Sequence, residues 1–150
     1  MGQNKKQQTM RKYLICDFAR SDWGKTQTLN AVIGLLKTKT KPIVEEVIGD
    51  IDKFAIFEVK GKKIVVSTQG DPDSYQKEGL LRAVNDNADI IVCASRTKGS
   101  TVNDIYDTTN GHYEIIWFNN FYADNKDLSY IPSLQNISAE AIVNLILTII

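Results

Sequence analysis

The residues best suited to chemistry lie between positions 19 and 27, directly after a short apolar run at 13–18. Gly24 allows a close backbone approach, Lys25 can reach terminal phosphates, and the Thr26 hydroxyl can bind Mg²⁺. The N–H groups at the start of a following helix would add donors for an anion. We therefore expect a phosphate-binding loop, and its binding residues are Ala19, Arg20, Ser21, Asp22, Trp23, Gly24, Lys25, Thr26 and Gln27.

The segment after the loop has the spacing of one helix face, with apolar residues at Leu29, Val32, Ile33 and Leu36. Strand, loop and helix thus follow one another in the order that such a loop requires. The pattern A-x-x-x-x-G-K-T resembles the Walker A motif of the P-loop NTPase superfamily, with Ala19 where glycine is usual. The resemblance implies a three-layer α/β/α fold, a nucleoside triphosphate with Mg²⁺ as ligand, and hydrolysis or phosphoryl transfer.

The rest of the chain alternates between strand and helix patterns. The runs 54–59 and 63–67 flank Lys60-Gly61-Lys62, which predicts an antiparallel hairpin. Further strands are expected at 43–48, 89–94 and 113–118, and further helices at 74–87, around 102–106 and at 138–150. This order predicts an α/β fold with a mostly parallel sheet, covered on both faces, and one antiparallel hairpin strand at an edge.

The chain contains no repeat and no change of composition that would mark a boundary. Residues 1–150 are therefore expected to form a single nucleotide-binding domain, in which residues 1–12 are flexible. In parallel sheets, ligands bind beyond the carboxyl ends of the strands. The loops that follow residues 18, 67, 94 and 118 should consequently converge on one site.

A second Mg²⁺ ligand is expected after a buried strand, because P-loop proteins carry an acidic residue there. The run 63–67 continues as Ser67-Thr68-Gln69-Gly70-Asp71, so Asp71 is the nearest carboxylate. Related folds place this strand beside the one that carries the loop, and we expect Asp71 to hold Mg²⁺ together with Thr26. Gln69 is expected to orient the attacking water. The alternative role for Asp71 is to cap the helix that begins near Ser74.

The sequence also bears on whether the nucleotide is ATP or GTP. The hairpin followed by Gly70 also resembles the corresponding region of small regulatory GTPases. Those proteins recognise guanine with an N-K-x-D loop. Neither the segment 95–98 nor the segment 119–122 contains that pattern, so ATP is favoured over GTP. Arg96 follows a strand end and is expected to contact phosphate charge.

Composition excludes some classes of partner. Eighteen basic residues balance eighteen acidic residues, so no net positive charge favours nucleic acid or an anionic membrane surface. No apolar stretch approaches the roughly 18 residues that cross a bilayer. Cys16 and Cys93 each lie within an apolar run and not in a CxxC pair, which predicts buried, reduced thiols and fits the cytoplasm.

Three functions remain compatible with these residues. The first is an ATP-binding enzyme, a Mg²⁺-dependent NTPase or a small-substrate kinase, with Lys25, Gln69 and Asp71 as catalytic residues. The second is a non-catalytic switch, in which nucleotide orders the segment 67–78 for a protein partner. The third, a partition-type ATPase that acts with DNA, is disfavoured by neutral charge and small size.

Overall fold

The computed structural model describes residues 11–19, 24–48, 51–70, 75–96, 100–125 and 127–150. The positions of all the main expected elements are confirmed within one or two residues, except for the last helix. In chain order the elements are β1 (Lys12–Phe18), α2 (Lys25–Lys37), β2 (Val44–Ile48), β3 (Asp52–Val59), β4 (Lys62–Ser67), α3 (Tyr75–Asn85), β5 (Ile90–Ser95), α4 (Ser100–Thr109), β6 (Tyr113–Phe118) and α5 (Ile131–Ile149). The helix α5 begins at Ile131, seven residues before the expected Ser138. Its first two turns carry polar residues after Pro132, so the apolar pattern of the sequence predicts a later start.

The strands form one six-stranded sheet in the order β2-β3-β4-β5-β1-β6. The pairings of β1 with β5, β1 with β6 and β4 with β5 are parallel, while β3 is antiparallel to both β2 and β4. The prediction of a mostly parallel sheet is therefore confirmed. The prediction that the reversed strand lies at an edge is wrong, because β2 covers β3. Ion pairs of Glu45 with Lys37 and of Glu46 with Arg82 hold this acidic edge strand to two helices.

The hairpin between β3 and β4 has the expected tight turn. Val59 pairs with Lys62, so the connection consists of Lys60 and Gly61. Both residues have a positive φ, of 53° and 75°. Positive φ at both central positions defines the type I′ turn, whose twist matches that of the flanking strands.

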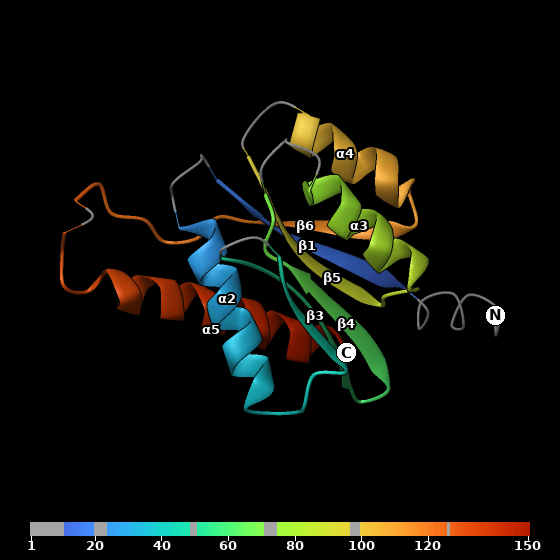
Figure 1. The fold of residues 1–150 in the computed structure, drawn as a ribbon, viewed down its shortest axis with the longest axis horizontal. Helices are drawn as coiled ribbons and strands as arrows, with labels where there is room; N and C mark the ends of the chain where they lie inside the picture. Colours follow the sequence, from blue (N-terminus) through green and yellow to red (C-terminus); the bar gives the residue numbers. More distant parts are fainter. Residues whose placement is uncertain (1–10, 20–23, 49–50, 71–74, 97–99, 126) are drawn as a thin grey trace.

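Two pairs of helices cover the two faces of the sheet (Figure 1). The helices α2 and α5 bury Leu29, Ile33 and Ile142 against one face. On the other face, α3 and α4 pack through residues that include Leu80 and Ile105. The architecture is accordingly a three-layer α/β/α arrangement, with a separate apolar core on each side of the sheet.

The four strands β4, β5, β1 and β6 are neighbours in the sheet and run in the same direction. Their carboxyl ends therefore lie along one edge, as expected for loops that share a site. The strand β4 does not lie beside β1, however, because β5 is inserted between them. The expected role of Asp71 assumed that β4 lies directly beside β1, and this assumption is wrong. At about 4.8 Å per strand, the end of β4 lies about 10 Å from that of β1.

A glycine brings α3 close to this edge. A Cβ atom at Gly79 would lie 2.5 Å from the Oγ of Ser67, at the end of β4. Replacing Gly79 by Ala should therefore destabilise the fold by about 1–2 kcal/mol, since forcing the helix away outweighs the better helix propensity of alanine. Urea unfolding of the variant measures this loss.

Two further variants test the contact. Removing the hydroxyl in the pair Gly79→Ala/Ser67→Ala leaves Ser67 Cβ at 3.3 Å as the nearest atom, so most of the stability should return. The matched control is Gly34→Ala in α2, where no atom lies within 4 Å and stability should rise by up to about 1 kcal/mol. Equal losses at both glycines would show that the contact has no role.

Candidate phosphate-binding site

The start of α2 has the geometry of an anion site. Gly24 precedes the helix with φ 81° and ψ 20°, a left-handed conformation that favours glycine. Within the described residues no side chain caps the helix, and the N–H groups of its first turn lack partners within the helix. These donors follow β1, which is the second strand from one edge of the sheet. The expected order of strand, loop and helix is confirmed, while Arg20, Ser21, Asp22 and Trp23 lie outside the described residues.

Lys25 connects the two ends of the loop. Its ammonium donates a hydrogen bond to the carbonyl oxygen of Ala19, at 2.5 Å, and the residue is only 8% exposed. The side chain of Lys25 is therefore packed within the fold. The next two residues complete the turn, with Thr26 half-buried and Gln27 exposed. The ammonium of Lys25 thus links the first residue of α2 to Ala19, which follows β1.

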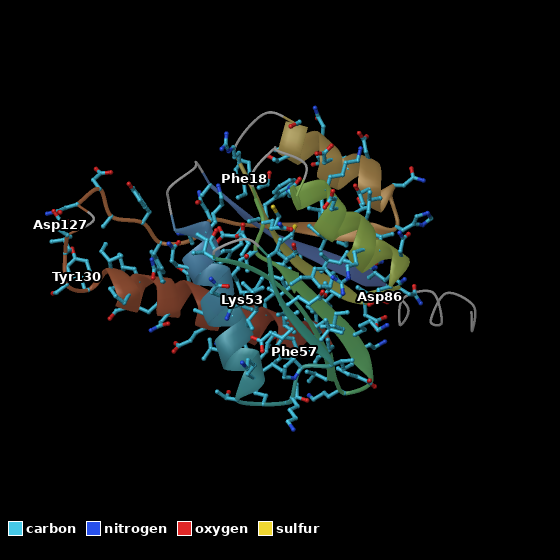
Figure 2. All side chains as sticks on the ribbon, in the orientation of Figure 1. Phe18, Lys53, Phe57, Asp86, Asp127 and Tyr130 are labelled. Carbon is cyan, nitrogen blue, oxygen red and sulfur yellow. The ribbon has the colours of Figure 1, made fainter. Side chains whose placement is uncertain are left out.

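Asp17 lies two residues before Ala19 and was not among the expected site residues. It belongs to β1, is fully buried, and is paired in register with Ala94 on one side and Phe118 on the other. Neither carboxylate oxygen has a hydrogen bond of normal geometry within the described residues. Burial raises the pKa of Asp17 to about 7, although the backbone amide of Asn120 and the charge of Lys25 act to lower it. Figure 2 labels the adjacent Phe18 at the carboxyl end of the sheet.

The segment after β6 and the first part of α5 both lie beside Gly24. A Cβ atom on Gly24 would be 3.5 Å from Nε2 of Gln135 and 3.9 Å from Nδ2 of Asn120. The amide of Asn120 donates to the carbonyl oxygen of Phe121, and the N–H of Phe121 donates to the hydroxyl of Ser138. These bonds hold the segment between β6 and α5 beside Gly24.

On the other side of β1, the strand β5 ends in Ser95 and Arg96. The hydroxyl of Thr101 accepts hydrogen bonds from the hydroxyl of Ser95 and from the backbone N–H of Arg96. The side chain of Gln76 donates to the carbonyl oxygens of Ala94 and Thr101, which ties α3 and α4 to the end of β5. Arg96 therefore follows the strand beside β1, as expected, and no carboxylate occupies that strand end.

The segment after β4 leans over β5. A Cβ atom on Gly70 would lie 3.0 Å from the Cβ of Ala94, so only a small residue fits there. Gln69 is buried, and its Oε1 lies 3.7 Å from the Cβ position of Gly79 in α3. This side chain is packed beneath α3 and is not exposed beside Lys25. Asp71 lies outside the described residues.

Of the two residues expected to bind magnesium, Thr26 lies within the described part of the chain and Asp71 does not. The hydroxyl of Thr26 lies in the first turn of α2 on a half-buried residue, which suits a metal beside bound phosphate. Within residues 11–19, 24–48, 51–70, 75–96, 100–125 and 127–150, no group of three or more His, Cys, Asp or Glu residues could hold a metal.

The two cysteines lie on the opposite face of β1 from Asp17. Cys16 and Cys93 are register partners in β1 and β5, and both are buried and free, as predicted. A hydrogen bond with the Cys93 side chain, followed by burial, raises the pKa of the Cys16 thiol well above its usual value. This thiol consequently remains protonated and is a poor nucleophile.

Two broader observations bear on the function. Among the helices of the described ranges, none combines the length and the apolar character needed to span a bilayer. No protein-family model matches the chain, and no curated protein shows significant similarity to it.

Proposed function

We propose that the protein binds MgATP through residues 19–27 and acts as a Mg²⁺-dependent NTPase or small-substrate kinase. The observation that supports this most directly is the left-handed Gly24 at the start of an uncapped α2, followed by Lys25 folded back to Ala19. A triphosphate would offer the ammonium of Lys25 a charged partner in place of a neutral carbonyl. Charge-assisted hydrogen bonds of this kind are about twice as strong as neutral ones.

In this proposal, catalysis comes from positioning and charge. Lys25 stabilises charge on the transferred phosphoryl group, and Thr26 with Asp71 holds Mg²⁺, which neutralises charge on the phosphate oxygens. Arg96, at the end of the neighbouring strand, adds a second cation. Gln69 orients the attacking water, which requires that it leave its buried place beneath α3 when nucleotide binds.

A second candidate is a nucleotide-controlled binding switch with a protein partner. It is supported by the end of β5, the strand beside β1, which carries Ser95 and Arg96 and no carboxylate. Nucleotide would then order the segment 67–78, which already leans over β5 at Gly70. ATP turnover distinguishes the two candidates, because only the enzyme releases ADP and phosphate at a rate that depends on Mg²⁺.

A thermal-shift screen with Mg²⁺ tests the proposal. Ligand at 100 times its dissociation constant adds about 2.7 kcal/mol of stability. For a domain of this size, that free energy raises the melting temperature by roughly 5–10 °C. MgATP should produce such a shift, whereas AMP, which lacks the terminal phosphates, should produce little. Equal shifts with all nucleotides or with none would contradict a phosphate-binding loop.

We expect the protein to bind the nucleotide base without selectivity for guanine, and we predict that ATP binds more tightly than GTP. The segment 119–122 lies beside Gly24 and contains Asn119, Asn120, Phe121 and Tyr122, with no aspartate to accept from the guanine N–H groups. Competition of ATP and GTP against a fluorescent analogue measures the ratio of the two affinities. Tighter binding of GTP would exclude this interpretation of the segment.

A further inference from the structure

The strand β6 forms one edge of the sheet (Figure 1). Among the described strands it pairs only with β1, so the backbone N–H and C=O groups on its other side have no partner strand there. Edge strands usually carry charges or proline, which discourage a further strand. The opposite edge strand, β2, follows this rule, because Glu45 and Glu46 hold it to neighbouring elements through ion pairs. In contrast, β6 contains no proline and a single charged residue, Glu114. Of the two edges, β6 is therefore the one better able to accept a further strand.

An aromatic cluster of Phe18, Tyr106 and Trp117 lies on the face of β6 that points towards α4. Trp117 is 40% exposed, and Tyr106, which belongs to α4, is 53% exposed. The centroid of the Trp117 ring lies 5.3 Å from that of Phe18 and 6.1 Å from that of Tyr106. Because the rings hold one another in place, the cluster loses little side-chain entropy when it contacts a partner. Trp and Tyr are also among the residues that contribute most to the affinity of protein interfaces.

The charge around this edge has one sign. Residues 100–125 contain no Lys or Arg and four acidic residues, which are Asp104, Asp107, Glu114 and Asp124, although the whole chain is neutral. A second copy of the chain paired through β6 would bring these carboxylates together, and nucleic acid or an anionic membrane would be repelled. A basic partner is attracted instead, and its Lys and Arg side chains also bind favourably over exposed Trp and Tyr rings.

We propose that β6 and the aromatic cluster bind an extended Lys- or Arg-rich segment of another protein, which adds to the sheet as a seventh strand. The backbone of this segment forms hydrogen bonds with the unpaired side of β6. Alternate side chains of a strand point to opposite faces, so every second side chain of the segment lies on the side of Trp117 and Tyr106, and the others lie on the side of Glu114. This surface does not include residues 19–27, and the binding does not need a nucleotide.

Nuclear magnetic resonance of the isotopically labelled full chain, without nucleotide, tests the proposal. The probe is a peptide of about eight residues that alternates Lys with Val, long enough to pair along the whole of β6. The backbone amide signals of residues 113–118 should shift and saturate as the peptide is added. A peptide that alternates Glu with Val should not bind. A Lys–Val peptide with N-methylated backbone amides keeps its charge but cannot donate hydrogen bonds to β6, and it should bind at least about tenfold more weakly.

Two pairs of variants test the side chains. Trp117→Ala should weaken binding of the Lys–Val peptide by about tenfold or more, whereas Tyr130→Ala, at an exposed aromatic residue before α5, should not. Glu114→Lys should weaken binding by about threefold or more. The matched control is Glu58→Lys, which makes the same change of charge at an exposed position of β3 and should bind as the wild type.

Several outcomes would overturn the proposal. They are the absence of shifts in β6 with the Lys–Val peptide, equal binding of the Glu–Val peptide, unchanged affinity of the N-methylated peptide, and equal effects of the two charge reversals. A dimer of the chain that Trp117→Ala dissociates would also overturn it, because a second copy would then cover β6. If Trp117→Ala does not fold, the N-methylated peptide and the pair of charge reversals still decide.

Discussion

Replacing Asp17 by Asn is expected to remove a pH dependence of stability worth up to about 4 kcal/mol. Burial raises the pKa of this carboxyl from 3.8 to about 7. Between these values the folded protein keeps a proton that the unfolded chain has lost, so the folded state loses stability as the pH rises. About three units at about 1.4 kcal/mol each give the magnitude, and the loss is complete above about pH 7.

Urea unfolding without nucleotide at several pH values from about 4 to 8 measures this effect. The difference in the free energy of unfolding between Asp17→Asn and the wild type should move in favour of the variant across this range, and then stay constant. The exposed-carboxylate variant Asp107→Asn should show no such trend relative to the wild type. A difference between Asp17→Asn and wild type that does not vary with pH would mean that Asp17 is solvated in the folded protein.

The local elements could be predicted because their signals are local. The turn at Lys60 and Gly61, the apolar face of α2 and the run of β6 each depend on residues near in sequence, and each has the expected boundaries. The start of α2 belongs to this class, because Gly24 and Lys25 lie close to β1 in the sequence. Its glycine has the positive φ that its position in the motif implies.

The order of the strands could not be predicted in the same way. A crossover helix of similar length can return the chain to either neighbouring position, so the sequence between β4 and β5 does not state which strand lies beside β1. The insertion of β5 changes the site, because Ser95 and Arg96 now follow the strand next to β1. The close approach of Gly79 to Ser67 is also non-local and has no signal in the residues themselves.

The sequence contains a signal that singles out Asp17. An aspartate within the run Tyr13–Phe18 is unusual for a strand expected to be buried on both faces, since buried carboxylates are rare unless they are paired. The apolar residues of the run predict the strand, and Asp17 is the exception among them. A charged residue inside a strand that leads into a binding loop is better interpreted as part of the site.

Replacing Lys25 by Ala is expected to weaken MgATP binding by at least about 100-fold. The variant loses the ammonium that we propose contacts phosphate, and two charge-assisted hydrogen bonds at about 1.5 kcal/mol or more each correspond to that factor. Lys25 is buried and bonded to Ala19, so a loss of binding alone does not distinguish a lost contact from a disturbed fold. The double variant Lys25→Ala/Asp17→Asn resolves this, because it removes both charges and leaves no unpaired carboxylate in the core. The double variant should recover the wild-type melting temperature within a few degrees, yet calorimetry should still detect no tight binding of MgATP. Wild-type affinity in either variant would show that Lys25 does not hold the phosphates.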